Sequence, residues 1–416
     1  MTLPSQGRDS EFKSCPTINN LKVSAGPSQM SNYSIYTPKE DSTLLEGHVK
    51  KYAFGSVLDM GTGSGIQAIA ASKNKKVNSV LALDIQKEVI EHCKNSIKDK
   101  KITLMVSDLF DSVKNKKFDT IIFNPPYLPN ELKVKDLTLE GGKKGYEVLE
   151  RFLNGVNKYL KPNGTVLIIF SSLTKRNKVD KFIKNNLLES ELLEKQKYFF
   201  EELYVYKIVK STLLKKLEKL EIGKINYLTK GNRGLIFTGL FKGKKVAIKV
   251  KNPKSTAISR IENEINFLKK LNKKNIGPKL LFSDKGFFVY GFVEGTSFEQ
   301  YLKINNKKSI IKIIKNILDQ LFVMDKLKIN KEEMSHPKKH IIIDKKPILL
   351  DFEKSHYVKN PSNVTQFCDY LMSKRISTML KGNKININNK KLIQHSKIYK
   401  KNINKSNLNK IIGEIK

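Results

Sequence analysis

The first residues along the chain whose types and spacing could do chemistry form a glycine-rich segment that begins with an aspartate. It reads Asp59-Met60-Gly61-Thr62-Gly63-Ser64-Gly65, with Asp59 leading glycines at Gly61, Gly63 and Gly65. We expect it to join a short buried strand to a helix, where glycines let the backbone approach a ligand closely before turning into the helix N-terminus. Such a loop alone would fit a dinucleotide enzyme equally well.

Acidic residues follow the next two expected strands. Asp84 ends the second strand, where a carboxylate can accept hydrogen bonds from ribose hydroxyls. Asp108 and Leu109 follow the third, where a carboxylate can accept from an adenine amino group and an apolar neighbour can flank the ring. Each acid taken alone is equally well explained by helix capping or a solvated turn. Signals at three successive strand ends together favour an adenosyl ligand.

The fourth expected strand ends in a polar tetrapeptide, Asn124-Pro125-Pro126-Tyr127. The Asn124 side-chain oxygen and the Pro125 carbonyl can accept both N–H bonds of a planar amino group. Pro126 helps to fix the loop, and Tyr127 offers a face for the target group. Accepting both protons directs the nitrogen lone pair toward a methyl donor, and no strong general base is needed.

Buried β-branched runs alternating with helical patterns must position these residues. Strands are expected at 57–60, 80–83, 102–106, 118–123 and 165–170, with an amphipathic helix at 86–97, followed by two further strands that end with 203–209. This pattern predicts a doubly wound α/β domain with a Rossmann-like parallel sheet.

The tetrapeptide resembles that of class I methyltransferases acting on exocyclic or amide nitrogens. The segments 36–42, 141–145 and 171–174 are similar to those of the archaeal and eukaryotic branch of HemK-type N5-glutamine methyltransferases, over about residues 33–210. The resemblance implies S-adenosylmethionine as cofactor and the Gly-Gly-Gln glutamine of a peptide chain release factor as target. It also implies a small zinc-binding activator subunit, and some family members modify lysine.

A second unit follows, with three short strands expected at 224–250, a helix at 257–273, two strands at 279–292 and a long helix at 308–328, an α+β order. Over about residues 220–375 this unit resembles small Bud32- and RIO-type kinases. The nucleotide loop would be Gly231–Gly234, the lysine–glutamate pair would be the lysine of Val246–Lys249 with Glu264, and the metal-binding triplet would be Asp351-Phe352-Glu353. This resemblance implies a kinase-like nucleotide site with ATP, and Mg at Asp351.

The segment 331–340 departs from the catalytic loop of that family. Anchoring on Met334 places Glu333 at the position of the catalytic base, whereas anchoring on His340 places Ser335 there. Glu353 replaces the usual glycine of the triplet. We therefore expect ATP binding to survive better than phosphoryl transfer, and a pseudokinase-like module remains an alternative.

The charge distribution is uneven, because residues 201–416 carry 47 of the 78 basic and 18 of the 40 acidic groups. This basic half could contact RNA or the ribosome, so an RNA N-methyltransferase and a bifunctional methyltransferase and serine/threonine kinase stay open as alternatives. The three widely spaced cysteines indicate neither disulfides nor a zinc site, and no metal is expected in the methyltransferase unit. No apolar run suggests a membrane segment, which favours a cytoplasmic protein.

We predict four segments in all: a disordered extension over 1–30, the methyltransferase over 31–210, the kinase-like domain over 211–380, and a flexible or partly helical basic tail over 381–416.

Overall fold

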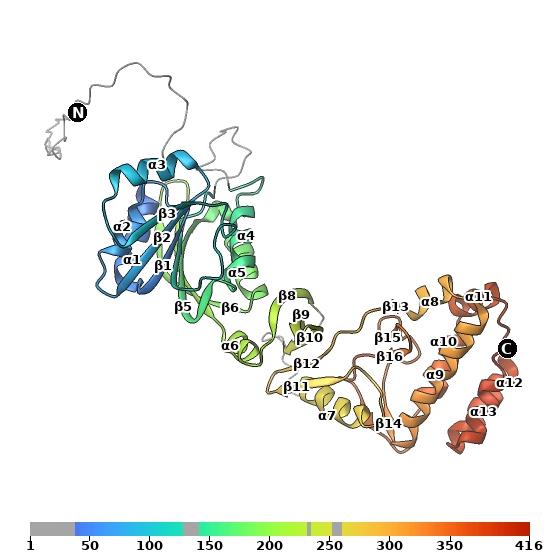
Figure 1. Cartoon of the computed structure of the whole chain (residues 1–416). Helices are drawn as coiled ribbons and strands as arrows, with labels where there is room; N and C mark the ends of the chain where they lie inside the picture. The colour runs from blue at the N-terminus through green and yellow to red at the C-terminus, as the bar shows by residue number, and fades with distance from the viewer. Residues whose placement is uncertain (1–37, 128–140, 231–233, 252–259) are drawn as a thin grey trace, which may run out of the picture.

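The computed structural model describes residues 38–127, 141–230, 234–251 and 260–416. The chain forms an α/β domain at one end and a second, smaller sheet followed by helices at the other (Figure 1). The expected extension over 1–30 lies outside the described residues, and the domain boundaries stay a prediction.

A seven-stranded sheet in the order β3-β2-β1-β4-β5-β7-β6 forms the centre of the first domain. Five of its strands are parallel, and they are β1 (Gly55–Met60), β2 (Val77–Asp84), β3 (Ile102–Val106), β4 (Phe118–Phe123) and β5 (Leu160–Ser171). The hairpin of β6 (Leu188–Lys197) and β7 (Glu202–Lys210) adds two antiparallel strands beside β5. The five predicted parallel strands are confirmed, although β3 is only partly buried because it lies at the sheet edge.

Helices cover both faces of this sheet. Leu45 of α1 (Glu40–Tyr52) and Ala68 of α2 (Ile66–Ser72) pack on one face against inward-pointing strand residues such as Val57. Phe152 of α4 (Glu147–Val156) and Val179 of α5 (Arg176–Asn185) pack on the other. Successive strand residues point to opposite faces, so both clusters draw on the same strands. The doubly wound prediction is confirmed, and α3 (Lys87–Ser96) follows β2 where a helix was expected.

The second domain begins beyond α6 (Thr212–Lys219), whose Leu214 and Leu217 belong to a core cluster that continues into the small sheet. That antiparallel sheet has the order β11-β12-β10-β9-β8. Its strands are β8 (Gly223–Lys230), β9 (Gly234–Phe241), β10 (Lys244–Lys251), β11 (Leu280–Asp284) and β12 (Phe287–Gly291), with α7 (Arg260–Asn272) between β10 and β11. The predicted α+β order is confirmed.

The remainder is mainly helical. It also contains two short sheets. One is formed by β13 (Thr296–Ser297), β15 (Ile341–Ile343) and β16 (Pro347–Leu349), and the other by β14 (Ile329–Asn330) and β17 (His356–Tyr357). The helices are α8 (Phe298–Ile304), α9 (Lys307–Lys326), α10 (Asn363–Met372), α11 (Lys374–Gly382), α12 (Asn389–Lys401) and α13 (Lys405–Gly413). None of the described helices combines the length and apolar character of a membrane span.

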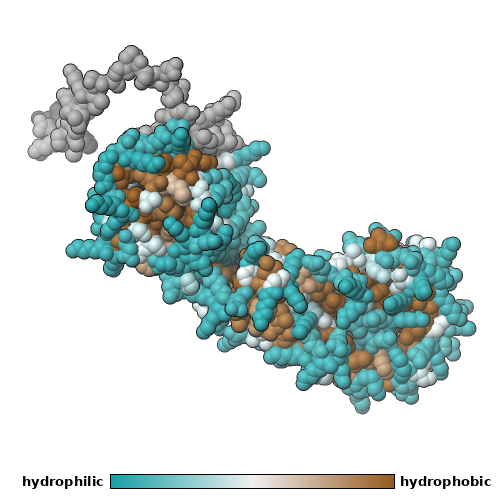
Figure 2. Space-filling view, in the orientation of Figure 1, coloured by the Kyte–Doolittle hydropathy of each residue, from teal (hydrophilic) through white to brown (hydrophobic). Residues whose placement is uncertain are grey.

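The C-terminal segment 381–416, for which we expected a flexible or partly helical tail, packs onto the second domain. It is helical, and Tyr399, Leu408 and Ile411 are fully buried in the core of the second domain. Its apolar residues are widely spaced among lysines, so the packing could not be recognised from the local pattern. Hydrophilic residues cover most of the visible surface of this domain (Figure 2), in keeping with its excess of lysine.

Candidate active site

The glycine-rich loop turns from β1 into α2 through left-handed backbone. Gly61, Gly63 and Gly65 have φ angles of 64°, 53° and 82°, a region that side chains other than glycine rarely adopt. At Gly65 a Cβ atom would also lie 2.4 Å from Cδ1 of Ile97. The loop therefore requires glycine at this position for both backbone and packing reasons.

Asp59 is buried under this loop and is hydrogen-bonded to it. Its carboxylate accepts a hydrogen bond of 2.6 Å from the Thr62 hydroxyl, and its side chain is 1% exposed. Burial raises the pKa of Asp59 to about 7. We predicted Asp59 as a cofactor-binding residue, but it is absent from the residues that line the cavity described below, as is Gly65. Both residues shape the loop that lines the cavity, and their part in cofactor binding stays a prediction.

Asp84 closes β2 and faces the same loop. Its Oδ2 accepts from the Gly63 backbone N–H at 3.0 Å, and its Oδ1 accepts from the Gln86 N–H at 3.0 Å. Burial raises the pKa of Asp84 above its ordinary value. The side chain lines the cavity, and each oxygen retains capacity to accept from a ligand hydroxyl.

Asp108 and Leu109 lie at the end of β3, also on the cavity wall. The Asp108 carboxylate pairs with the Arg151 guanidinium of α4 at 2.9 Å. Leu109 has a positive φ of 46°, so this turn is held in an uncommon conformation. Ile85, 59% exposed, also lines the cavity and was not identified from the sequence.

The tetrapeptide 124–127 ends β4 at the same edge of the sheet, and all four of its residues line the cavity. The Asn124 amide donates from Nδ2 to Asp41 Oδ2 at 3.0 Å and to Ser42 Oγ at 3.4 Å. The Tyr127 hydroxyl donates to the same Asp41 oxygen at 3.4 Å. Asp41 therefore joins the first turn of α1 to the tetrapeptide.

These contacts determine which way the Asn124 amide points. Its Oδ1 is shielded from solvent and meets no hydrogen-bond donor among the described residues. Rotating the amide by half a turn would bring Oδ1 against the Asp41 carboxylate, two acceptors facing each other. The arrangement therefore leaves an acceptor oxygen available for a donor that enters the cavity.

The residues that hold Asn124 were missed by sequence reasoning. Asp41 and Ser42 lie in a segment singled out only for its resemblance, and Gln67 of α2 donates to the Ser42 carbonyl at 2.8 Å. The contact between Asp41 and Asn124 spans 83 positions, so no local pattern reveals it. The carboxylate in the first helical turn of α1 was the only signal available.

These residues surround a cavity of about 490 Å³ at the carboxyl edge of the parallel strands. Ligands in open α/β sheets bind at this edge. The glycine loop, Asp84 and Ile85 offer close backbone, hydroxyl-binding and apolar contacts, a set that fits an adenosyl group. The cavity continues to Asn124, so one ligand site adjoins the expected methyl acceptor.

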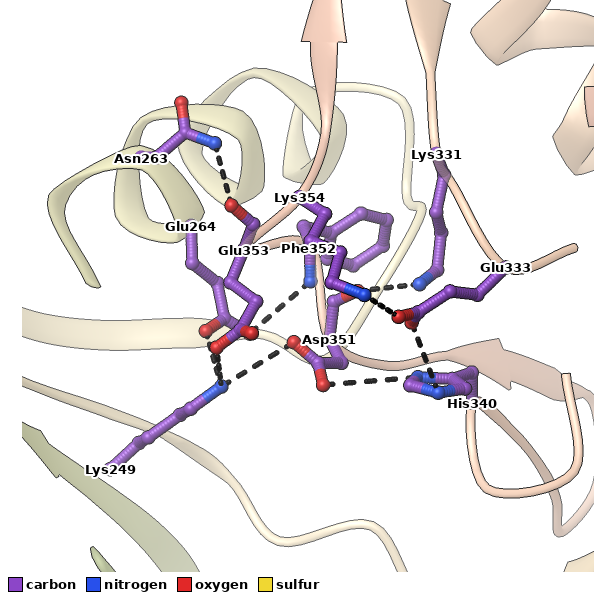
Figure 3. Close-up of polar contacts among 10 residues, drawn as sticks. All are labelled: Lys249, Asn263, Glu264, Lys331, Glu333, His340, Asp351, Phe352, Glu353 and Lys354. Carbon is purple, nitrogen blue, oxygen red and sulfur yellow. Dashed lines mark hydrogen bonds and ion pairs between the residues drawn. The ribbon is translucent and has the colours of Figure 1, made fainter. Parts of the chain in front are cut away.

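A second polar cluster lies in the C-terminal domain (Figure 3). Lys249 of β10 donates to Glu264 of α7 at 2.6 Å, and its Nζ lies 3.5 Å from Asp351 Oδ1 and 3.6 Å from Glu353. Burial alone would lower the pKa of Lys249, but the Glu264 and Asp351 carboxylates raise it, so the ammonium stays charged. Three carboxylates therefore surround one lysine.

The sequence alone left open whether Glu333 or Ser335 lies near Asp351, and the contacts of the two residues differ. Glu333 contacts His340 at 3.3 Å and pairs with Lys354, and His340 Nδ1 lies 3.9 Å from Asp351 Oδ2. Ser335 instead contacts its neighbour His336. The structure thus brings Glu333, not Ser335, to the cluster.

Lys331 is a buried cation that sequence reasoning did not single out. It is 1% exposed, its Nζ donates to the Asp351 carbonyl at 2.5 Å, and burial lowers its pKa to about 8. Residues 231–233 of the expected nucleotide loop lie outside the described residues.

Fold and cavity together define the first domain as a class I methyltransferase domain. The family model of the methyltransferase small domain matches residues 29–200. A putative protein N5-glutamine methyltransferase of Methanocaldococcus jannaschii is 36% identical over 195 residues, which cover 45% of this chain and 95% of that protein. The chain belongs to the protein N5-glutamine methyltransferase family, and it is an S-adenosylmethionine-dependent methyltransferase.

Two further similarities concern proteins of translation. The release factor glutamine methyltransferase of Streptococcus pneumoniae is 31% identical over 27% of this chain, which spans 44% of that protein. The solved E. cuniculi complex of Mtq2 and Trm112, described as responsible for methylating the termination factor eRF1, is 25% identical. That match covers 42% of this chain and 98% of the solved one, with a TM-score of 0.35.

Proposed function

We propose that the first domain methylates the side-chain amide nitrogen of the glutamine in the Gly-Gly-Gln motif of a peptide chain release factor. The observation that carries this proposal is the orientation of Asn124, a residue of the cavity wall whose Oδ1 is shielded from solvent and meets no donor among the described residues. A primary amide is a planar group that brings two N–H donors to such an acceptor. Relatives named release factor glutamine methyltransferases support the choice of substrate.

The chain's own residues can perform the positioning that this reaction needs. Asn124 Oδ1 accepts one amide proton, and the Pro125 carbonyl is proposed to accept the other, so the nitrogen lone pair is aimed at the methyl donor. When bound, S-adenosylmethionine supplies an electrophilic methyl group. The amide nitrogen gains the methyl and then loses a proton that has become acidic, so no strong base is required.

The test is transfer of labelled methyl from S-adenosylmethionine to purified release factor and, in parallel, to total RNA, each with and without a small zinc-binding subunit. Label on the release factor, lost when the Gly-Gly-Gln glutamine is replaced, is the expected result. We include the subunit because the family resemblance implies an activator of this kind. Label on RNA alone would replace this proposal by RNA methylation, with the basic second domain as the RNA contact.

We also propose a nucleotide site in the second domain, carried by the Lys249–Glu264 pair beside Asp351. In protein kinases such a pair positions a lysine toward nucleotide phosphates, and an aspartate holds Mg²⁺. Glu333 is the candidate for the catalytic base, and its Oε2 lies 3.3 Å from His340 Nε2. A rise in the unfolding temperature with ATP and Mg²⁺, absent in Lys249→Met, would support the site, and no shift in the wild type would refute it.

A further inference from the structure

Two adjacent aromatic side chains stand almost fully in solvent at the tip of the β6–β7 hairpin. Phe199 is 93% exposed and Phe200 is 87% exposed, and their rings contact each other with centroids 4.7 Å apart. Exposure of two neighbouring phenylalanines costs solvation free energy without any gain in packing, and such patches commonly mark binding surfaces. We call this pair, Phe199 and Phe200, the aromatic tip.

Sheet topology puts the aromatic tip at the edge where the active-site cavity opens. β7 runs antiparallel to β5, and Leu203 pairs with Ser171 at the carboxyl end of β5. β5 lies parallel to β4, whose carboxyl end continues into Asn124. The Glu202 N–H donates to the Ser172 hydroxyl at 3.1 Å, which ties the hairpin to the segment that follows β5.

Other exposed apolar residues gather at the same edge. Six large apolar side chains are exposed in the described part of the first domain, and five of them, all but Leu192, end a strand or lie next to a strand end at the cavity side. They are Ile85, Val106, Leu173, Phe199 and Phe200. Because exposed apolar groups are otherwise scattered, this concentration indicates a surface that meets another apolar surface.

The charge around the aromatic tip favours a protein over a nucleic acid as its binding partner. Tyr198, the neighbour of Phe199, has a raised pKa through burial and through the carboxylates of Glu40, Asp41, Glu194 and Glu201. Two lysines, Lys195 and Lys197, lie on the same hairpin, and Lys195 pairs with Glu202 at 2.8 Å, so carboxylates outnumber cations beside the tip. An excess of carboxylates disfavours a phosphate backbone, although the chain as a whole carries a net charge of +38.

We infer that the aromatic tip and its acidic neighbours form the docking surface for the protein substrate, contacting apolar and basic side chains near the methylated residue. This inference rests on the proposed function, because it takes the methyl acceptor to be a protein. Docking there places the substrate chain across the cavity mouth, so that its target side chain can reach Asn124. Contact at the tip stabilises substrate binding and leaves the chemical step unchanged.

The test measures steady-state methylation of the release factor by the full chain carrying Phe199→Ser and Phe200→Ser. We expect KM for the release factor to rise by about tenfold or more, as for a buried aromatic anchor. The kcat and the cofactor dissociation constant should stay within about twofold of wild type, because the tip does not contact the reacting groups. Leu192→Ser, on the same hairpin but away from the cavity edge, is the matched control and should leave KM unchanged.

The outcomes separate the two ideas. If the wild type methylates the release factor and the double variant has an unchanged KM, the docking surface is refuted and the proposed function stands. If the wild type labels total RNA and not the release factor, both are refuted. A fall in kcat without a change in KM would likewise overturn docking, since it would give the hairpin a part in the chemical step.

Discussion

Asn124 is the residue on which the proposed chemistry depends most, and its environment explains why. Asp41 and Ser42 engage its Nδ2, so its Oδ1 is left as an acceptor without a donor among the described residues. The buried carboxylate of Asp41 thereby acts on the substrate through Asn124. Asp41 is in this sense a positioning residue.

Replacing Asn124 by Ala should remove one acceptor while leaving the cofactor half of the cavity intact. We expect kcat to fall by a factor corresponding to about 3 kcal/mol in the barrier, as for loss of an oriented hydrogen-bonding group at a reacting centre. Steady-state kinetics and equilibrium binding of the cofactor measure the two effects. Unchanged turnover would contradict the role given to Asn124.

Asp41→Ala should free the Asn124 amide to rotate, and kcat should fall between about tenfold and about a hundredfold. Asp41→Asn keeps an acceptor oxygen for Nδ2 and should recover much of the loss, which a purely structural defect would not show. The affinity for the cofactor should not change in either variant. Equal kcat values for the two variants would argue against orientation as the cause.

Asp84→Ala should weaken cofactor binding by about tenfold to a hundredfold, because a charge-assisted hydrogen bond to a ligand hydroxyl is lost. Asp84→Asn retains one acceptor and should lose less. Calorimetric titration with S-adenosylhomocysteine measures both. A dissociation constant equal to that of the wild type would show that the ribose lies elsewhere.

Sequence reasoning located the site residues that end strands and missed those brought in from helices. Asp84, Asp108 and Asn124 could be placed because the carboxyl ends of parallel strands meet at one edge of the sheet. Asp41 approaches Asn124 only through packing of α1 on the sheet, which a local pattern does not encode. The burial of Asp59 beneath the loop likewise depends on tertiary packing, and its role in cofactor binding stays a prediction.

At the scale of elements, the helices of the second domain are joined by a buried polar network that the sequence did not indicate. Asp325 of α9 accepts from the Asn363 side chain of α10 at 2.7 Å and from the Tyr399 hydroxyl of α12 at 3.0 Å. Asp325 is fully buried, and burial raises its pKa to about 6. The network connects α12, the penultimate helix of the chain, to the core of the domain.

This raised pKa predicts a pH dependence of stability. The folded state holds the Asp325 proton more tightly than the unfolded state, in which the carboxyl has its ordinary pKa of 3.8. Stability from this group is therefore present below the unfolded value and is lost as pH rises toward about 6. Comparing urea unfolding of wild type and Asp325→Asn, we expect the wild type to lose up to about 3 kcal/mol relative to the variant across that window. A difference between the two proteins that does not vary with pH would contradict the assignment.

Strand positions were predicted well because buried parallel strands carry continuous apolar runs, as at 166–170. The C-terminal helices were not, because their apolar residues are diluted by lysine and their burial depends on contacts with α9 and α10. Exposure of β3 also follows from strand order, which a linear pattern does not give.

At the scale of the whole molecule, two units of different character share one chain (Figure 1). The family assignment concerns the first unit, whereas the kinase likeness of the second stays a prediction carried by the Lys249–Glu264 pair. The net charge of +38 is concentrated in the second half, while carboxylates collect beside the active-site cavity. This contrast separates an acidic surface suited to a protein substrate from a basic half that could contact RNA.

The central claim is that the methyl acceptor is the glutamine amide of a release factor. Tandem mass spectrometry of the cognate release factor, after incubation with the full chain and S-adenosylmethionine, tests this claim most directly. We predict one methyl group on the side-chain nitrogen of the Gly-Gly-Gln glutamine with the wild type, and an unmodified glutamine with Asn124→Ala. Methylation at any other residue, or an unmodified release factor alongside methylated RNA, would contradict it.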